Sequence, residues 1–420
     1  MSDKQIHIFG GGTVSHVRNH LALAAPAYGS TAKALATLCK QIIPKMETVL
    51  HLTRMAQSFS RIETTEDLWV RALEVRDNPN TKIVFFNAAV ADFNGHVPGD
   101  RSGKYGTRLL TSQGLQHMQL VPAPKIINGF RQGDTGRKDL FLVGFKTTCD
   151  ATPEDQYLAG LNMLKASSCN LVLANDVRTR NNMIIAPEES TYCETTDREQ
   201  ALKQLVEMAF MRSHLTFTRS TVVAGDPVPW DDKRIPFSLR YVVDHCIKAG
   251  AYKRFRGVTA GHFAVKLDDQ TFLTSRRKTD FNDMATTGLV LVKTDGPDSV
   301  IAYGSRPSVG GQSQRIVFAD HPEEDCVVHF HCVKREGSPV PTVSQKEFEC
   351  GSHECGRNTS NGLKQFGELK AVYLDNHGPN IVFNQYTDPR MVVDFIEENF
   401  DLTTKSGGYQ VPAAINCAPT

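Results

Sequence analysis

Short β-branched or aromatic runs alternate with helix-length amphipathic runs over residues 5–186 of this 420-residue chain. The runs IHIFGGG, TVLHL, KIVFFNAAVAD, LFLVGF and NLVLAND indicate buried strands, and STAKALATLCKQI, TTEDLWVRALEVR and DQYLAGLNMLKAS have helical periodicity. Such alternation is typical of an open, mainly parallel sheet with helices on both faces. We therefore predict an α/β domain at residues 1–212, closed by a helix at about 196–211.

Polar residues gather where these predicted strands end, which is where ligands of open α/β sheets bind. They lie at residues 10–13 (GGGT), 87–92, 144–146 and 175–176. The GGGT run would offer free backbone N–H groups to a phosphate or ribose. It lacks both the G-x-G-x-x-G spacing and the Walker lysine, so ordinary dinucleotide and P-loop sites are disfavoured, and a tight turn without a ligand is an equally good interpretation.

Taken together, these strand ends resemble those of phosphopantothenoylcysteine synthetase. The similarity covers roughly residues 5–190 through GGGT with Val17 and Arg18, AAVAD at 88–92, VGF at 143–145 and ANDV at 174–177. It implies a Rossmann-like domain that uses CTP or ATP, with Mg²⁺, to activate a carboxylate as an acyl-nucleotide. The nucleotide-binding residues that it implies are Gly11, Gly12, Thr13, Ala89, Asp92, Lys104, Phe145, Asn175 and Asp176.

Within this set the resemblance implies distinct roles. Asp92 and Phe145 would shape the base and ribose pocket, and Lys104, in the loop SGKYG, would bind the triphosphate during catalysis. One loop departs from the family: its Ser-Ser-Gly-Lys stretch, which holds the acyl intermediate, is replaced by the largely apolar residues 19–29. Nucleotide binding is therefore better supported than the phosphopantothenate reaction itself.

The composition changes after this domain. Residues 213–236 are rich in Thr and Val and then read GDPVPWDDKRIP, which predicts a linker. An amphipathic helix (FSLRYVVDHCIKAG), short strands (HFAVKL, TFLT, GLVLV, VIAYG) and a closing helix (DPRMVVDFIEENF) follow. Residues 237–420 are thus predicted to form a second α/β domain with a mixed or antiparallel sheet.

Three histidines of the second domain are candidate ligands of a metal ion. His329 and His331 end the run CVVHFH, where a strand would turn both side chains to one face, and His377 follows a later strand in the turn DNHGP. Three imidazoles with one open position are typical of a catalytic site, so we predict that these histidines bind a divalent metal, zinc in the first instance. The alternative is a pair of strand histidines and an unrelated turn histidine.

Over about residues 237–400 the order of motifs resembles the class II aldolase and adducin family. The motifs are TAGH at 259–262, LTS at 273–275, RPS at 306–308, HFH at 329–331 and NHG at 376–378. Enzymes of that family use a three-histidine metal site in aldol cleavage, epimerisation or dehydration of phosphorylated sugars. The phosphate-binding residues that the resemblance implies are Thr259, Gly261, Ser275, Arg276 and Ser308. For Arg276, in the run RRK, an exposed charged turn is the alternative.

The acid/base glutamate of the enzymatic members is missing, because glycine stands at position 310. Another group would then have to transfer protons, and we predict Glu354 with His353, from the stretch FECGSHECG. The same stretch holds Cys350 and Cys355, but without a second close pair elsewhere it indicates a polar turn near a binding site rather than a structural zinc site. Adducin-type members keep the fold without catalysis.

Charge and hydropathy exclude several classes of partner. The 47 Lys and Arg balance 46 Asp and Glu, so we expect no nucleic-acid partner. No apolar run approaches the ~20 residues of a membrane span, and the ten scattered cysteines fit reduced thiols, so we expect a cytoplasmic protein that binds no membrane. Both resemblances imply a homo-oligomer acting on small phosphorylated molecules. The overall prediction is a bifunctional ligase-like and aldolase-like enzyme, and the alternative is a non-catalytic nucleotide- and metal-binding regulatory or assembly protein.

Overall fold

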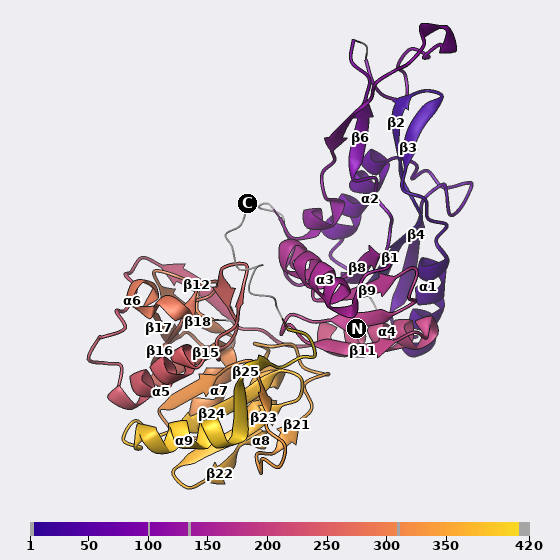
Figure 1. Ribbon diagram of the computed structural model, residues 1–420. Coiled ribbons are helices and arrows are strands. Elements are labelled where there is room, and N and C mark those ends of the chain that lie inside the picture. The colour runs from indigo at the N-terminus through magenta and orange to yellow at the C-terminus, as the bar shows by residue number, and fades with distance from the viewer. Residues whose placement is uncertain (1–3, 100, 133–135, 309–310, 411–420) are drawn as a thin grey trace. The chain divides into compact units, whose positions relative to one another are not determined.

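The computed structural model describes residues 4–99, 101–132, 136–308 and 311–410. It divides into two compact α/β units (Figure 1). Unit 1 comprises Met1–Ile185 and Cys193–Ser213, and unit 2 comprises Ala186–Tyr192 and His214–Thr420. The main division, after Ser213, lies next to the predicted boundary at residue 212. The short segment Ala186–Tyr192, which the sequence did not separate, also belongs to unit 2.

A seven-stranded sheet of order β11-β10-β9-β8-β5-β1-β4 forms the centre of unit 1. Its strands are β1 (Gln5–Gly10), β4 (Glu47–Leu52), β5 (Thr81–Phe86), β8 (Phe141–Thr148), β9 (Leu171–Asp176), β10 (Asn182–Ile185) and β11 (Thr191–Thr195). The pairs from β4 through β1, β5 and β8 to β9 are parallel, and β10 joins β9 antiparallel. The predicted mainly parallel sheet is confirmed, and its five parallel strands are those that the apolar runs indicated.

Helices cover this sheet as the amphipathic runs predicted. They are α1 (Ser30–Ile42), α2 (Thr65–Asp77), α3 (Pro153–Ser167) and α4 (Arg198–Ser213). The unit also contains the 3₁₀ turns η1 (Thr111–Gln113), which is exposed, and η2 (Ile126–Phe130). α1 packs against β1, β4 and α4, and α3 packs against β8 and β9. α2 begins at a capping box in which Thr64 and Asp67 each accept the other's backbone N–H.

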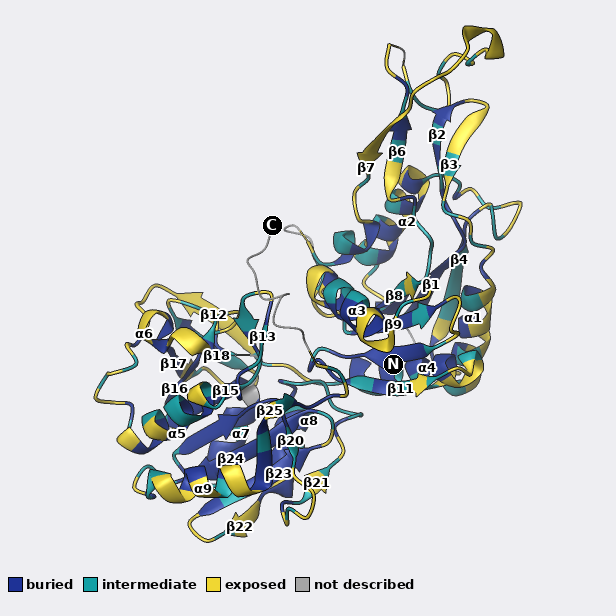
Figure 2. Ribbon diagram, in the orientation of Figure 1, coloured by how far each residue is buried: buried dark blue, intermediate teal, exposed yellow. Residues whose placement is uncertain are grey.

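Two hairpins extend from the carboxyl ends of the parallel strands. β2 (Val14–Arg18) pairs with β3 (Leu21–Ala24), and β6 (Phe93–His96) pairs with β7 (Gln119–Pro122). Figure 2 shows how exposed β3 and β7 are beside the buried sheet. The apolar run at residues 19–29 thus includes a strand, β3, in place of a loop.

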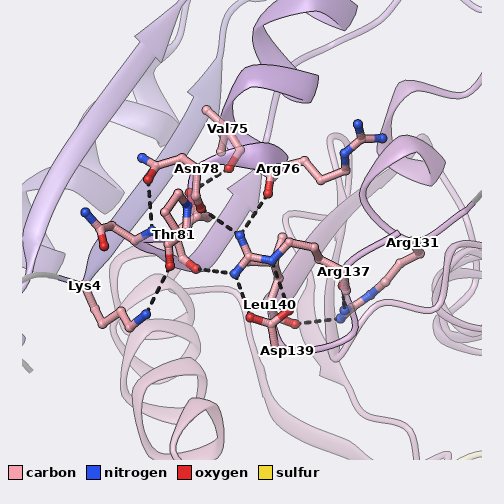
Figure 3. A network of polar contacts seen from close by, with 11 residues as sticks. Lys4, Val75, Arg76, Asn78, Thr81, Arg131, Arg137, Asp139 and Leu140 are labelled. Atoms are coloured by element: carbon pink, nitrogen blue, oxygen red, sulfur yellow. Dashed lines mark hydrogen bonds and ion pairs between the residues drawn. The ribbon is translucent and has the colours of Figure 1, made fainter. Parts of the chain in front are cut away.

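Arg137 fastens the turn that leads from α2 into β5 (Figure 3). Its Nη1 donates to the carbonyls of Arg76 at 2.9 Å and Asn78 at 2.7 Å, and Nη2 donates to the Thr81 carbonyl at 3.3 Å. Asp139 pairs with the same guanidinium at 2.6 Å, and this hydrogen bond lowers the pKa of the Asp139 carboxyl. One side chain therefore donates to three main-chain carbonyls between the end of α2 and the start of β5, and the Asn78 carbonyl also accepts from Thr81 N at 3.1 Å.

Unit 2 is built on a ten-stranded sheet of order β12-β18-β17-β16-β15-β19-β24-β23-β21, with β22 paired to β23. Its strands are β12 (Arg219–Val223), β15 (His262–Lys266), β16 (Thr271–Ser275), β17 (Leu289–Thr294), β18 (Ser299–Tyr303), β19 (Cys326–His329), β21 (Thr342–Val343), β22 (Lys364–Phe366), β23 (Leu369–Leu374) and β24 (Gly378–Phe383). Parallel pairing occurs only at its two ends, β12–β18 and β21–β23, among the described pairs. The sheet is therefore mixed, which confirms the prediction for this domain.

Helices pack on both faces of this sheet. They are α5 (Phe237–Lys248), η3 (Phe281–Asp283), α6 (Met284–Thr287), α7 (Gly311–Asp320), α8 (His353–Gly362) and α9 (Pro389–Asn399). Two-stranded ribbons are formed by β13 (Arg254–Phe255) with β14 (Val258–Thr259) and by β20 (Cys332–Lys334) with β25 (Phe400–Lys405). Along β15, Phe263 joins a core cluster with α5 and α9, whereas Ala264 joins one with α7. This alternation gives the sheet a buried layer on each face.

Residues 213–236, predicted as a linker, are folded. They include β12, which lies at the sheet edge and pairs in parallel with β18. All five of its residues are exposed, and Gly225 and Pro227 follow directly, so the local composition indicated a loop. The strand is held by main-chain pairing, which composition does not report.

None of the helices in the described parts of the chain has the length and apolarity needed to span a membrane.

Candidate metal centre and nucleotide site

The structure brings His329, His331 and His377 together. Their ring centroids lie 4.6 to 5.0 Å apart, and the candidate ligand atoms all lie within 4.8 Å of one another. All three side chains are buried, at 5 % exposure or less. Nitrogens bound to one zinc ion at about 2.1 Å in a tetrahedron are about 3.4 Å apart, so small ring rotations would complete the geometry.

Two local features place these rings. β19 ends at His329, and β24 pairs antiparallel with it so that Asn380 lies opposite His329. His377 sits in the turn between β23 and β24, where its N–H donates to the Leu374 carbonyl at 2.9 Å. Gly378 has φ +139°, and a Cβ there would lie 2.1 Å from the Phe330 carbonyl oxygen. Only glycine permits this approach, which brings the turn against the chain between the other two histidines.

The His329 ring is fixed in the orientation that a ligand needs. Its Nδ1 donates to the Pro379 carbonyl at 2.7 Å, so in the neutral ring Nε2 carries the lone pair. Nε2 is buried and has no hydrogen-bond partner among the described residues. Burial lowers the pKa of His329 to about 4, so the neutral form that binds metals is the one present at neutral pH. A ring N–H held by a backbone carbonyl is the usual support of a histidine ligand.

A fourth imidazole, His262, adjoins the three. It lies opposite His329 in the β15–β19 pairing, and the two ring centroids are 4.7 Å apart. The Gln314 side-chain amide donates to His262 Nδ1 at 2.8 Å, and burial holds the pKa of His262 well below its usual value. Neither His262 nor Gln314 was singled out from the sequence, because their proximity depends on pairing between distant segments.

The donor set fits a divalent metal of the zinc type. Within residues 4–99, 101–132, 136–308 and 311–410, no carboxylate or thiol joins the three-imidazole cluster. Position 310, where the sequence has glycine in place of the expected glutamate, lies outside the described residues. Three buried imidazoles, one of them with a nitrogen that contacts no hydrogen-bond partner among the described residues, are ligands that zinc and similar ions prefer.

The residues predicted to bind phosphate differ in whether their side chains already make hydrogen bonds. Ser275 ends β16 beside Ser308, whose N–H donates to the Ser275 carbonyl at 2.8 Å, and the buried Ser275 hydroxyl has no partner among the described residues. Thr259 instead donates to the Thr279 carbonyl at 3.2 Å. Arg276 donates to Ser305 at 3.0 Å and to the Thr287 carbonyl at 2.7 Å, so its guanidinium supports the surrounding loops.

Gly261, also predicted to bind phosphate, packs against the main chain of His329. It has φ +111°, and a Cβ would lie 2.6 Å from the His329 carbonyl oxygen. This close packing brings β15 against β19 at the level of the histidines.

Glu354 and His353, predicted as the acid/base pair, have partners elsewhere. The Glu354 carboxylate accepts from Thr216 N at 3.0 Å and from Thr216 Oγ1 at 3.1 Å. His353 Nε2 lies 3.1 Å from Thr218 Oγ1. These contacts tie the start of α8 to the chain before β12, and an acid/base role for either residue stays a prediction. Cys350 and Cys355 join no metal-binding group within the described ranges.

In unit 1 two backbone N–H groups of the GGGT run, those of Gly12 and Thr13, donate to main-chain carbonyls and are therefore not the free donors that were predicted. Gly12 N donates to the Ala27 carbonyl at 2.8 Å and Thr13 N to the Ala89 carbonyl at 3.0 Å. The Thr13 hydroxyl is buried and accepts from Ala91 N at 3.1 Å. The run therefore ties the end of β1 to the chain after β5, and it places Ala89 there as well.

Charged side chains cluster beyond the carboxyl ends of the parallel strands. Asp92 pairs with Lys125, and Lys104 pairs with Glu63 at 3.0 Å. Arg54 contacts the same Glu63 carboxylate at 3.1 Å, and the hydrogen bond from Lys104 lowers the pKa of Glu63. Lys125 was not singled out from the sequence; a lysine directly before the buried turn η2 was the available signal.

Phe145 and Lys146, predicted to follow a strand, lie within β8, which continues to Thr148. Phe145 is one residue beyond the last pairing of β8 with β5, so it still reaches the edge where β5 has ended. Asn175 is half-buried near the end of β9.

Asp176, at the end of β9, organises its own loop. Its carboxylate accepts from the backbone N–H groups of Thr179 at 2.9 Å and Ala151 at 3.0 Å, and from the Thr148 hydroxyl at 2.8 Å. The hydrogen bond from Thr179, followed by those from Ala151 and Thr148, holds the pKa of Asp176 well below its usual value. It therefore shapes the crevice by fixing the loops after β8 and β9.

Family comparison agrees with both resemblances. The family model for the DNA/pantothenate metabolism flavoprotein C-terminal domain matches residues 1–210. The chain belongs to this family. A second model, the class II aldolase and adducin N-terminal domain, matches residues 242–386. The chain thus joins domains of two enzyme families, and we refer to unit 1 as the pantothenate-type unit and to unit 2 as the aldolase-type unit.

Solved structures include similar proteins for each unit. A DNA/pantothenate metabolism flavoprotein from Streptococcus pneumoniae is 20 % identical and has a TM-score of 0.39, with 49 % of this chain and 97 % of that chain covered. An L-fuculose-1-phosphate aldolase from Thermus thermophilus is 17 % identical and has a TM-score of 0.30, with 39 % and 91 % covered. Comparison with curated proteins gives no match.

Proposed function

We propose that this protein is a cytoplasmic, homo-oligomeric, bifunctional enzyme for small phosphorylated molecules. The aldolase-type unit would perform metal-dependent lyase or isomerase chemistry, and the pantothenate-type unit would activate a carboxylate with CTP or ATP and Mg²⁺. The observation that carries the proposal is the buried cluster of three imidazoles, in which the ligand atoms lie within 4.8 Å of one another.

In the aldolase-type unit, His329, His331 and His377 would hold a divalent ion, zinc in the first instance. A bound ion of this kind supplies Lewis-acid polarisation of a substrate carbonyl. The chain contributes the fixed orientation of His329 through the Pro379 carbonyl, and burial that excludes water from the ligands. The buried Ser275 hydroxyl, which has no partner in the part of the chain that the structure describes, would donate to a substrate phosphate, because a buried hydroxyl without a partner is costly until a ligand accepts its hydrogen bond.

In the pantothenate-type unit, Lys104 and Asp92 would contact the nucleotide. Lys104 is half-exposed and bound to Glu63, so a triphosphate could compete for its ammonium group. Asp92 is exposed beside Lys125 and could accept from ribose or base donors. Phe145 and Asn175 would line the same crevice, and Asp176 would hold its loops in place.

The metal site can be tested by elemental analysis of the purified protein and of His331→Ala. We expect about one zinc or similar ion per chain in the wild type and a near-complete loss in the variant. His245→Ala is the matched control, because His245 is a surface histidine of the same unit that pairs with Glu397. Equally low metal in all three proteins, after growth with added zinc, would refute the site.

The nucleotide reaction can be tested by incubating the protein with CTP or ATP and a panel of carboxylates and amines. We expect carboxylate-dependent release of pyrophosphate or nucleoside monophosphate. Measurable nucleotide affinity without turnover of any carboxylate would instead support the non-catalytic alternative for this unit. The replacement of the polar acyl-binding loop by β3 is the observation that favours this alternative.

A further inference from the structure

The segment Ala186–Tyr192, which connects β10 to β11, folds with the aldolase-type unit. It forms a tight turn in which Glu189 N donates to the Ala186 carbonyl at 2.9 Å and Ala186 N donates to the Ser190 carbonyl at 3.0 Å. Ser190 is fully buried and Glu189 is 5 % exposed. Burying such polar residues is unfavourable unless they have partners, so the segment must make specific contacts.

One group of contacts goes to the turn that carries His377. The Ser190 hydroxyl donates to the carbonyl of Asn376, the residue before His377. Asn376 has φ +57°, a left-handed conformation that is uncommon outside glycine. Asparagine tolerates this conformation better than most residues, and the hydrogen bond from Ser190 fixes the backbone at this position, directly before His377.

A second group of contacts joins the segment to the end of β25. Lys405 is 2 % exposed, and its Nζ donates to the Glu189 carbonyl at 2.9 Å and lies 4.0 Å from the Glu189 carboxylate. Thr191 donates to the Gly407 carbonyl from its N–H at 3.0 Å and from its hydroxyl at 2.9 Å. We call residues 186–192 and 405–407 together the clasp.

The clasp also contacts the ligand histidines directly, through their main chain. The Ser406 hydroxyl donates to the His377 carbonyl at 2.6 Å, and Ser406 N donates to the His331 carbonyl at 3.1 Å. His329 is thus oriented through its ring by Pro379, whereas the clasp holds the backbone of the other two ligands.

We propose that the clasp positions His331 and His377 for metal binding, with Ser190 and Lys405 as its principal positioning residues. This inference rests on the proposed metal site. Support around a ligand commonly changes metal affinity by about 10- to 100-fold when it is lost. A chain segment supplied from between two strands of the pantothenate-type unit would then determine how well the aldolase-type unit binds its metal.

The test uses the full-length protein, freed of metal and titrated with Co²⁺, whose visible absorption reports both affinity and ligand geometry. Ser190→Ala and Lys405→Met are expected to weaken Co²⁺ binding about 10- to 100-fold and to alter the absorption bands. Ser238→Ala is the matched control, because Ser238 is also buried in this unit and also donates to a carbonyl, that of Gln385, at 2.7 Å. It should keep the wild-type affinity and spectrum.

Thermal unfolding of the metal-free proteins separates positioning from general destabilisation. If Ser190→Ala and Ser238→Ala lose similar stability but only Ser190→Ala loses Co²⁺ affinity, the positioning role is supported. Wild-type affinity and spectrum in folded Ser190→Ala would overturn the positioning role alone. Failure of the wild type to bind Co²⁺ would overturn the metal site and this inference with it.

Discussion

The paired histidines His7 and His51 should make the pantothenate-type unit lose stability in mild acid. They lie on the adjacent strands β1 and β4 with stacked rings, and His7 Nδ1 is 2.9 Å from His51 Nε2. Burial lowers the pKa of His7 to about 4 and that of His51 to about 3. One hydrogen between the two nitrogens satisfies both neutral rings, whereas two protonated rings would repel each other.

The sign and size of the effect follow from proton linkage. An unfolded histidine titrates near pH 6.5, so between about pH 6.5 and 4 the unfolded state binds protons that the folded state does not, and stability falls as the pH falls. Each histidine can contribute up to about 1.4 kcal/mol per pH unit in this window. Allowing for partial solvent screening, we expect the pair to remove roughly 2–4 kcal/mol between pH 7 and pH 5.

Fluorescence can isolate this unit, since the chain has only two tryptophans. Trp69 lies in α2 and Trp230 lies in the other unit, so urea unfolding in a Trp230→Phe background follows Trp69 alone. The stability difference between pH 7 and pH 5 should shrink by about 2–4 kcal/mol in His7→Gln/His51→Gln. It should be unchanged in His117→Gln, which alters an exposed histidine of the same unit. An equal pH dependence in the paired variant and its parent would refute the reasoning.

Three further predictions concern single positions. Arg137→Met should destabilise the pantothenate-type unit by about 2–4 kcal/mol, because three carbonyls lose a charged donor. Arg137→Lys should recover only part of this stability. A wild-type urea midpoint in either variant would contradict the prediction. Gly378→Ala should abolish zinc retention, because its Cβ would meet the Phe330 carbonyl at 2.1 Å; normal zinc content by elemental analysis would show that the turn can adjust. Lys104→Ala should weaken CTP or ATP binding in calorimetry about tenfold while leaving the unfolding midpoint nearly unchanged, since its ion pair with Glu63 is largely exposed; unchanged affinity would exclude Lys104 from the nucleotide site.

The sheet architecture of both units could be predicted because buried strands and amphipathic helices leave a periodic record in the sequence. The five parallel strands of the pantothenate-type unit are of this kind. β12 left no such record, because it is an exposed edge strand followed by glycine and proline. The apolar run LFLVGF indicated β8, but the strand continues beyond this run to Thr148 through polar residues that carry no apolar signal.

In the candidate site, too, some residues could be predicted from the sequence and others could not. The three histidines could be proposed from their places beside predicted strands, and the structure brings them together. The strand that was expected to carry both His329 and His331 ends at His329, so His331 lies between β19 and β20. Their supporting residues could not, because Pro379, His262 and Gln314 become neighbours only through strand pairing and helix packing. Arg276 was predicted from its place directly after Ser275, and Glu354 from its place in the stretch FECGSHECG. Neither position reveals the hydrogen bonds that these side chains make, Arg276 to the Thr287 carbonyl and Glu354 to Thr216.

The placement of Ala186–Tyr192 has a genetic consequence: the aldolase-type unit is not one continuous stretch of the chain. A gene fragment that begins at residue 214 would encode every ligand histidine, yet it would omit the seven residues that hold the turn around Asn376. A fragment that ends at residue 213 would carry those seven residues away from their partners. A single break in the gene therefore cannot give two complete units, because residues 186–192 lie within the stretch that encodes the pantothenate-type unit. We expect the coding regions of the two units to stay in one gene.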